Sequence, residues 1–184
     1  MFNLSTQEVV LSIENSPLTK LNGIVYQEYH NFLGNSVLKE LKNLENLNLV
    51  KLEKQFDVPR RRVDYNNDLI KKLKIFFMNS KITNALAKKF NTELQFDSVD
   101  IWIDKPGYYL KPHTDDSRIK LAIQIYLGED ENVGTALFDK DNNVLKTFEY
   151  KLNSGYALLN TKNSFHGVDK IEKDGRISLY VRYC

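Results

Sequence analysis

The second half of the chain alternates polar and apolar residues over several short runs, and this alternation is the feature that most restricts the fold. We predict that these runs are strands, because they are rich in β-branched and aromatic residues and are broken by Gly, Asp and Asn. The loops between them are too short for the crossovers that parallel strands need. Short antiparallel strands in this number favour a sandwich or jelly roll. The predicted strands are Ser98–Ile103, Ile119–Leu127, Thr135–Phe138, Leu145–Lys151, Tyr156–Leu159 and Arg176–Tyr183.

Two of these segments, Lys120–Leu127 and Arg176–Tyr183, carry a polar face opposite an apolar one. Successive side chains of a strand point to opposite faces, so every second residue shares a face. A sheet with one face in water would show the same pattern. The first half of the chain supplies helices that need an apolar sheet face to cover, and we therefore expect the polar faces to line the mouth of a barrel. Their residues are Lys120, Ala122, Gln124 and Tyr126 in the first strand and Arg176, Ser178, Tyr180 and Arg182 in the second.

Helical spacing of apolar residues dominates the first half of the chain. We expect Gly23–Tyr29 to be extended, Ser36 to be a helix N-cap, and Ile75 to lie on the apolar side of its helix. The predicted helices are Thr6–Glu14, Ser36–Leu47, Asp68–Met78 and Ile82–Phe90.

Helices gathered before a strand-rich half predict an α+β fold, in which the helices buttress one face of a sheet. We predict a single domain over residues 1–184. Residues 1–95 would be mainly helical support and substrate-side elements, and residues 96–184 would form a jelly-roll core with the site. No repeat, low-complexity tract or Pro/Gly linker divides the chain.

The net charge of the chain does not indicate that it must bind an anionic partner. The chain has 26 Lys and Arg against 24 Asp and Glu, a formal net charge of +2. This is too small to imply nucleic acid or an anionic membrane surface, so we do not expect either as the partner. The run Pro59–Arg62 is the sharpest cluster of positive charge; a solvated loop and the recognition of an anionic or polar substrate both remain open for it.

The compartment is predicted from the cysteine content and the N-terminus. Cys184 is the only cysteine, so no internal disulfide is possible, and a reducing interior suits the chain. The N-terminal residues lack the basic start and apolar run of a signal peptide, and no apolar stretch is long enough to span a bilayer. We therefore expect a cytoplasmic protein; the sequence does not indicate its oligomeric state.

A metal-binding pattern lies between the predicted strands. His113 and Asp115 are two residues apart, so in an extended segment both side chains leave the same side and can bind one ion. A third ligand must come from elsewhere, and His166 is the remaining histidine of this half. Two imidazoles and one carboxylate form the facial ligand set of non-haem Fe(II) oxygenases. His30 has no partner at metal-ligand spacing, and we interpret it as a structural or surface histidine.

The neighbours of these residues, taken in order, carry a more specific pattern than His-x-Asp alone. Over about Val99 to Tyr183 the chain resembles the iron(II)/2-oxoglutarate-dependent dioxygenases, and within them the prolyl 4-hydroxylase-like branch. The matching motifs are Pro106-Gly107-x-x-Leu110-x-x-His113-x-Asp115, Ile125-Tyr126-Leu127, Gly134-Thr135-x-Leu137-Phe138, His166-Gly167-Val168 and Arg176-x-Ser178-Leu179.

The resemblance implies a double-stranded β-helix whose open end holds Fe(II) through His113, Asp115 and His166. It also implies that Arg176 pairs with the distal carboxylate of the cosubstrate 2-oxoglutarate, with help from Tyr126 and Ser178. The implied reaction uses O2 to hydroxylate an unactivated C–H bond of a peptide, of the prolyl type, or of a small amino-acid-like molecule. Succinate and CO2 are the other products.

Several residues depart from the family pattern or stand beside it. Asp104 occupies a position where many members carry an aromatic residue, so cosubstrate contacts on that strand are open. Asp116 is a second carboxylate beside Asp115, but a shift by one residue turns it to the opposite side of an extended chain. Tyr108 and Tyr109 either line the pocket or pack. The candidates for substrate contact are Arg182, Gln124, Arg60, Arg61 and Arg62.

Two other functions stay as alternatives. The spacing Arg176-x-Ser178-x-Tyr180-x-Arg182 is similar to a strand of nucleic-acid dealkylating dioxygenases. A non-catalytic jelly-roll module that binds a metal structurally is the other alternative, although structural metal sites usually close with four protein ligands.

Overall fold

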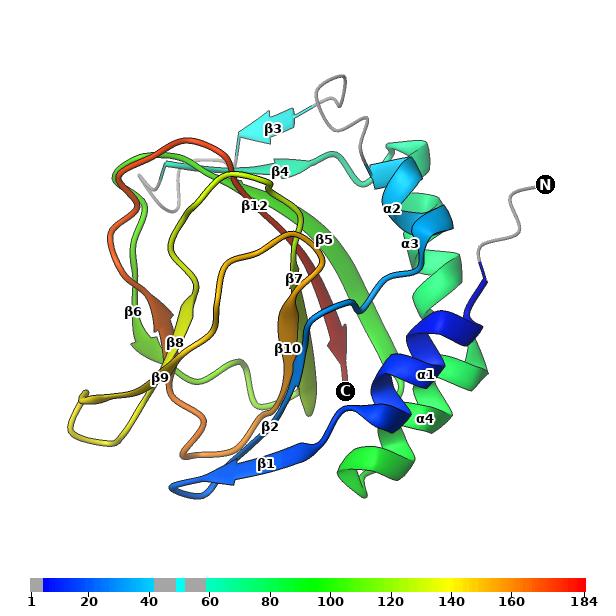
Figure 1. Cartoon of the computed structure of the whole chain (residues 1–184), viewed down its shortest axis with the longest axis horizontal. Helices are drawn as coiled ribbons and strands as arrows, with labels where there is room; N and C mark the ends of the chain where they lie inside the picture. Colours follow the sequence, from blue (N-terminus) through cyan, green and yellow to red (C-terminus); the bar gives the residue numbers. More distant parts are fainter. Residues whose placement is uncertain (1–4, 42–48, 52–58) are drawn as a thin grey trace.

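The computed structural model describes residues 5–41, 49–51 and 59–184. Within these ranges the chain is an α+β protein, in which the helices lie together on one side of the strands (Figure 1). The predicted fold class is therefore confirmed. The helices are α1 (Gln7–Asn15), α2 (Asn35–Leu41), α3 (Asp68–Phe77) and α4 (Ser80–Phe90).

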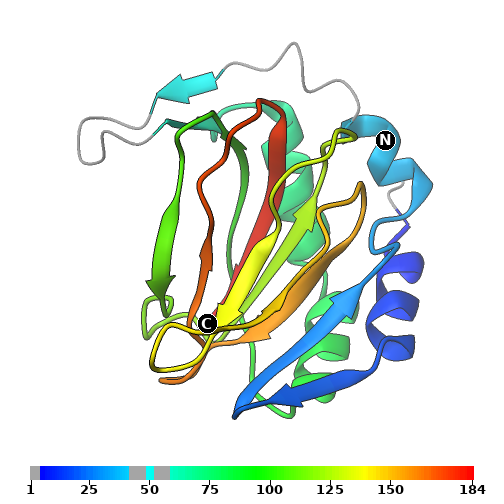
Figure 2. The same cartoon turned by 60° about the vertical axis from the view of Figure 1, so that its left-hand side comes forward.

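The strands form two antiparallel sheets. The larger sheet has the order β1-β2-β10-β7-β12-β5-β4-β3, and the smaller has the order β6-β11-β8-β9. Figure 2 shows the smaller sheet standing across from the larger one. The strands are β1 (Leu18–Leu21), β2 (Ile24–Tyr29), β3 (Leu49–Lys51), β4 (Arg60–Val63), β5 (Phe96–Asp104), β6 (Leu110–His113), β7 (Leu121–Tyr126), β8 (Thr135–Phe138), β9 (Val144–Thr147), β10 (Gly155–Leu159), β11 (His166–Val168) and β12 (Arg176–Tyr183).

The main core lies between the larger sheet and the helices. Ile123 of β7 and Val181 of β12 are fully buried there, together with Leu73 of α3 and Leu86 of α4. Full burial of one such side chain contributes about 1.5–3 kcal/mol. The apolar faces of β7 and β12 therefore point toward the helices, as predicted, and their polar faces point into the space between the sheets.

The N-termini of α3 and α4 follow from local sequence. Asn67 and Asn79 precede the two helices, and the side-chain oxygen of each accepts a hydrogen bond from the backbone N–H two residues later, at 2.9 Å in both cases. On α3 the buried residues include Leu73 and Phe77, whereas Ile75 is 74% exposed. Its predicted burial is wrong, because two residues along a helix turn a side chain by about 200° away from the buried face.

The helix predicted over Ser36–Leu47 is present as α2. It begins at Asn35, so Ser36 lies inside the first turn, and the prediction that Ser36 caps the helix is wrong. Residues 42–47 of the predicted helix lie outside the described residues. Among the described residues, no helix is both long enough and apolar enough to cross a membrane.

Strand β4 was not among the predicted strands, and it determines the arrangement of the site. It pairs with β5 at the side of the larger sheet, and β5 in turn pairs with β12. The register places Arg60 opposite Asp104, and Asp104 opposite Arg176. The pairing of these three strands thus forms a row of charged groups, in which the carboxylate of Asp104 lies between the guanidinium groups of Arg60 and Arg176.

A tight turn leads from β5 to the smaller sheet. The N–H of Tyr108 donates to the carbonyl of Lys105 at 3.0 Å, with Pro106 and Gly107 between them. Gly107 has a φ of 89°, which a glycine adopts without the steric strain of a Cβ atom. Proline followed by a glycine with positive φ is the usual central pair of a type II turn, so the sequence of the turn explains why the chain reverses here.

Asn153 ties the loop after β2 to the turn before β10. Its side chain is buried; Oδ1 accepts from the N–H of Leu33 at 2.7 Å, and Nδ2 donates to the carbonyl of Leu33 at 3.0 Å. Asn153 also has a left-handed backbone, with a φ of 61°, which asparagine tolerates better than most residues.

Candidate metal centre

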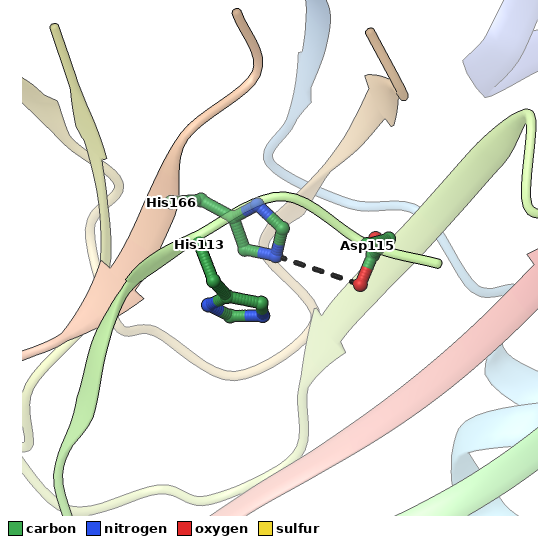
Figure 3. A group of neighbouring side chains, drawn as sticks. All are labelled: His113, Asp115 and His166. Carbon is green, nitrogen blue, oxygen red and sulfur yellow. Dashed lines mark ion pairs between the residues drawn. The ribbon is translucent and has the colours of Figure 1, made fainter. Parts of the chain in front are cut away.

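His113, Asp115 and His166 meet between the sheets. His113 ends β6, His166 begins β11, and the pairing of these strands places the two histidines opposite each other. One donor atom from each of the three residues lies within 4.8 Å of the other two. The histidine rings are 4.5 Å apart between centroids, and Nε2 of His166 is 3.9 Å from Oδ1 of Asp115 (Figure 3).

The hydrogen bonds of both histidines leave the same nitrogen free. Nδ1 of His113 lies 3.0 Å from the carbonyl of Lys111, and Nδ1 of His166 lies 3.0 Å from the carbonyl of Ser164. A carbonyl accepts only, so each Nδ1 carries the proton and each Nε2 offers a lone pair. Burial lowers the pKa of His166, which favours the neutral, ligating form.

The carboxylate of Asp115 is held by Tyr180 of β12. The tyrosine hydroxyl donates to the two carboxylate oxygens, at 2.9 and 3.1 Å. Burial, and then the neighbouring Asp115, raise the pKa of Tyr180, so the hydroxyl keeps its proton. Asp116 is directed elsewhere: its carboxylate accepts from Arg118, and its side chain is exposed. Asp115 is therefore the carboxylate that joins the histidines.

These three residues fit a divalent iron. Such a site needs two imidazole Nε2 atoms and one carboxylate, held in place by hydrogen bonds: here each imidazole donates its Nδ1–H to a carbonyl, and the carboxylate accepts from Tyr180. The three donors leave further coordination positions for exogenous ligands. Structural metal sites usually have a fourth protein ligand, but the cluster that the described residues form contains no fourth candidate.

A cavity of about 250 Å³ opens onto this cluster. Of the residues predicted to contact substrate, Arg60, Gln124 and Arg182 line it, whereas Arg61 and Arg62 do not. Arg61 is exposed to solvent. The described residues that line it are Arg60, Trp102, Leu110, His113, Asp115, Gln124, Thr135, His166, Val168, Tyr180 and Arg182.

Arg176, expected to meet the cosubstrate, is enclosed by protein. Its side chain is 0% exposed and does not line the cavity. Nε donates to the carbonyl of Val133 at 2.7 Å, Nη1 donates to Asp104, and Nη2 donates to Oγ1 of Thr135 at 3.3 Å. The structure thus gives Arg176 a carboxylate partner within the chain.

Arg60 reaches the same carboxylate from the other side. Its Nε and Nη2 donate to the two oxygens of Asp104, the second at 3.3 Å. The guanidinium carbon lies 4.7 Å from the ring centroid of Trp102 and 4.3 Å from that of Tyr108. The sequence shows that Arg60 and Asp104 are charged, but it did not predict their ion pair, because β4 was not predicted to pair with β5.

A second carboxylate on β5 has a similar environment. Asp100 is fully buried; Nη2 of Arg182 donates to it at 2.7 Å, and Nη1 of Arg62 lies 3.8 Å from it. The guanidinium of Arg62 also stacks on Tyr65, at 3.6 Å from the ring centroid. Arg62 therefore packs behind the wall of the site and does not line the cavity, whereas Arg182 both contacts Asp100 and lines the cavity.

Tyr126 and Gln124 of β7 belong to one hydrogen-bond network. The N–H of Thr135 donates to the Tyr126 hydroxyl at 2.8 Å, and Oε1 of Gln124 accepts from Thr135 at 3.0 Å and from Tyr156 at 2.7 Å. The network fixes the Gln124 side chain at the cavity. Ser178 is buried beside it on β12, and its hydroxyl has no partner in the described part of the chain.

Comparisons with known proteins find the fold but no close relative. No family model matches the sequence, and no curated protein matches it. The structure is similar to a prolyl 4-hydroxylase of Phytophthora capsici, with a TM-score of 0.65 and 15% identity, over 100% of this chain and 66% of that one.

Two further solved structures resemble it to a similar degree. HygX from Streptomyces hygroscopicus, with nickel, 2-oxoglutarate and hygromycin B bound, gives a TM-score of 0.62 at 12% identity, over 86% of this chain and 82% of that one. A prolyl hydroxylase of Trichoplax adhaerens, in complex with a peptide fragment of hypoxia inducible factor, gives 0.62 at 13% identity, over 97% and 88%. The chain therefore has the double-stranded β-helix fold of the 2-oxoglutarate/Fe(II) oxygenases, as the motifs implied.

Proposed function

We propose that the protein is an Fe(II)- and 2-oxoglutarate-dependent dioxygenase. The observation that carries this proposal is the meeting of His113, Asp115 and His166 at a cavity, with the Nε2 atom of each histidine left free. The fold supports it, because oxygenases of this fold include proteins solved with 2-oxoglutarate bound.

The side chains have separable roles in the proposed reaction. His113, Asp115 and His166 would hold the iron, and Tyr180 would keep the carboxylate of Asp115 oriented. Bound Fe(II) supplies the activation of O2 that couples decarboxylation of 2-oxoglutarate, to succinate and CO2, with insertion of one oxygen atom into a C–H bond. Every residue of β7 is buried, so this strand closes one wall of the site from behind.

The proposed substrate is a peptide, hydroxylated at a proline-like position, or a small amino-acid-like molecule. Arg182 and Gln124 border the cavity, so an acceptor on the substrate has both a guanidinium and an amide to contact. The amide nitrogen of Gln124 has no partner among the described residues, whereas its oxygen accepts two hydrogen bonds. The similarity to a peptide-bound prolyl hydroxylase agrees with the first of these substrates.

The first experiment tests the metal and the cosubstrate. Protein loaded with Fe(II) under argon is titrated with 2-oxoglutarate, and we expect the weak visible charge-transfer band of the chelate. His166→Ala should lose the band together with iron, whereas Asp116→Ala, which changes the neighbouring exposed carboxylate, should keep it. A wild-type protein that holds iron but gives a flat spectrum would contradict the proposal and favour a non-catalytic metal-binding module.

The second experiment identifies the substrate. Succinate formation is measured over proline-containing peptides, free amino acids and alkylated oligonucleotides. Turnover confined to peptides or amino acids supports the proposal, and turnover confined to the oligonucleotides would show a nucleic-acid dealkylase instead.

A further inference from the structure

The row of charged groups on β4, β5 and β12 carries one positive charge in excess. Asp104 is fully buried between Arg60 and Arg176 and accepts hydrogen bonds from both. Two guanidinium groups and one carboxylate sum to one positive charge. Because Arg176 is fully buried and Arg60 is largely buried, a positive charge without a counterion is unfavourable here, and a bound anion would complete this row.

Of the two guanidinium groups in the row, the one with unused hydrogen-bond donors at the cavity is that of Arg60. Its Nε and Nη2 are used by Asp104, but Nη1 has no acceptor among the described residues. Arg60 lines the cavity that contains the three candidate iron ligands, and Arg176 does not. Nε, Nη1 and Nη2 of Arg176 all donate to groups of the chain itself. An anion in the cavity therefore meets Arg60 first.

The guanidinium of Arg60 is also fixed in place before any ligand arrives. Trp102 and Tyr108 contact it through their rings, and Asp104 accepts from it through both oxygens. A guanidinium held on so many sides loses little freedom when it binds a carboxylate. Asp104 is the residue that the chain carries where the family pattern has an aromatic side chain.

Two hydroxyl groups beside the row have no partner. The hydroxyls of Tyr108 and Ser178 are buried and make no hydrogen bond in the described part of the chain. Burial raises the pKa of Tyr108 to about 12, so its hydroxyl is a donor at neutral pH. Neither hydroxyl lines the cavity; Tyr108 lies behind it, with its ring against the guanidinium of Arg60, so polar groups near the row are left unsatisfied by the chain itself.

We propose that Arg60 is the cation that binds the distal carboxylate of 2-oxoglutarate. Asp104 is then a positioning residue, which holds Arg60 in place and pairs with Arg176 so that Arg176 is not available to the cosubstrate. The assignment rests on the proposed function in taking 2-oxoglutarate as the ligand. It moves Arg60 from the substrate, where the sequence placed it, to the cosubstrate.

The test compares two ligands that differ only at the distal end. 2-Oxoglutarate and 2-oxoglutaramate, its uncharged amide, are titrated by calorimetry into the Mn(II)-loaded protein, in which no turnover occurs. We expect the wild type to prefer 2-oxoglutarate by about 30-fold or more, as for other desolvated charge pairs. Arg60→Gln should bring this preference to within about threefold, by weakening 2-oxoglutarate while leaving 2-oxoglutaramate unchanged.

Arg61→Gln is the matched control, because it removes the same charge from the same strand at an exposed position outside the cavity. It should keep the wild-type preference. Arg60→Lys, which keeps the charge but loses the fork, should bind 2-oxoglutarate more weakly and still prefer it to the amide, and it serves if Arg60→Gln does not fold.

An Arg60→Gln protein that keeps the wild-type preference would overturn the inference and point to Arg176 freed from Asp104. An equal loss for both ligands would overturn it too, because it would show a structural role only. Failure of the wild type to bind either ligand is a separate result, which removes the proposed function and the inference with it.

Discussion

Asp104→Asn should destabilise the protein far more than its isosteric shape suggests. The substitution removes one negative charge and leaves the volume almost unchanged, so no cavity forms. Arg176 then stays fully buried with no anionic partner, and Arg60 loses its bidentate acceptor. An asparagine amide accepts through one oxygen only and presents two further donors toward these guanidinium groups.

The magnitude follows from the burial of the pair. Removing one partner of a buried ion pair costs about 3–5 kcal/mol, because the other charge is left unpaired. Arg60 is 18% exposed on its side chain and can turn toward water, so we expect the lower end, about 3 kcal/mol. For a chain of 184 residues this corresponds to a fall in Tm of about 6–12 °C.

Urea unfolding measures the effect. The midpoint should fall while the slope of free energy against urea stays as in the wild type, since the same surface is exposed on unfolding. Asp174→Asn is the control, because Asp174 pairs with Lys105 on the surface at 2.9 Å, and exposed pairs contribute little. If both variants shift the midpoint equally, the row of buried charges does not contribute as we reason.

Three further predictions follow from single contacts. Tyr180→Phe should weaken the affinity for Mn(II) by about 10- to 100-fold by competition with a chelator, because Asp115 loses its orienting donor; an unchanged affinity would contradict the role of Tyr180. Asn153→Ala should lower the free energy of unfolding by about 2–4 kcal/mol in urea, since two buried groups of Leu33 lose their partners, and a loss under about 1 kcal/mol would contradict it. Burial raises the pKa of Tyr156 well above its ordinary 10.0, so the folded state keeps its proton when the unfolded state ionises. The contribution of Tyr156 to the free energy of unfolding is thus fully present below about pH 10 and is lost as the pH rises above it. Tyrosinate absorbance at about pH 11 should therefore be lower in native than in urea-unfolded protein, and equal absorbance would refute this.

The sequence predicted the parts of the fold that rest on local periodicity. Alternation in β7 and β12 predicted the apolar face that packs on the helices, because Ile123 and Val181 each stand directly beside a polar residue whose side chain leaves the opposite face of the strand. The spacing of His113 and Asp115 likewise predicted that both could reach one ion. That residues 1–184 act as one domain stays a prediction.

The parts that escaped prediction depend on contacts between distant segments. Arg60–Val63 has no apolar alternation, and a strand with charges on its inner face becomes favourable only because Asp100 and Asp104 lie on the neighbouring β5. β6 and β11 are short, and β6 contains Pro112, a residue that usually argues against a strand. Their pairing is fixed by the turn before β6 and by the smaller sheet as a whole.

Strand β4 bears on how sequences of this fold can change over time. A loss of Asp104 alone leaves two guanidinium groups without their carboxylate, and a loss of Arg60 alone removes the guanidinium that pairs with Asp104 at the cavity. We therefore expect the two positions to vary together among homologues, as a covarying pair on neighbouring strands. A homologue with an aromatic residue before the Pro-Gly turn should lack the β4 arginine, and in it the β12 arginine would be released for the cosubstrate. We therefore expect the pair to divide homologues into two groups, which differ in the strand that supplies the cation for the cosubstrate.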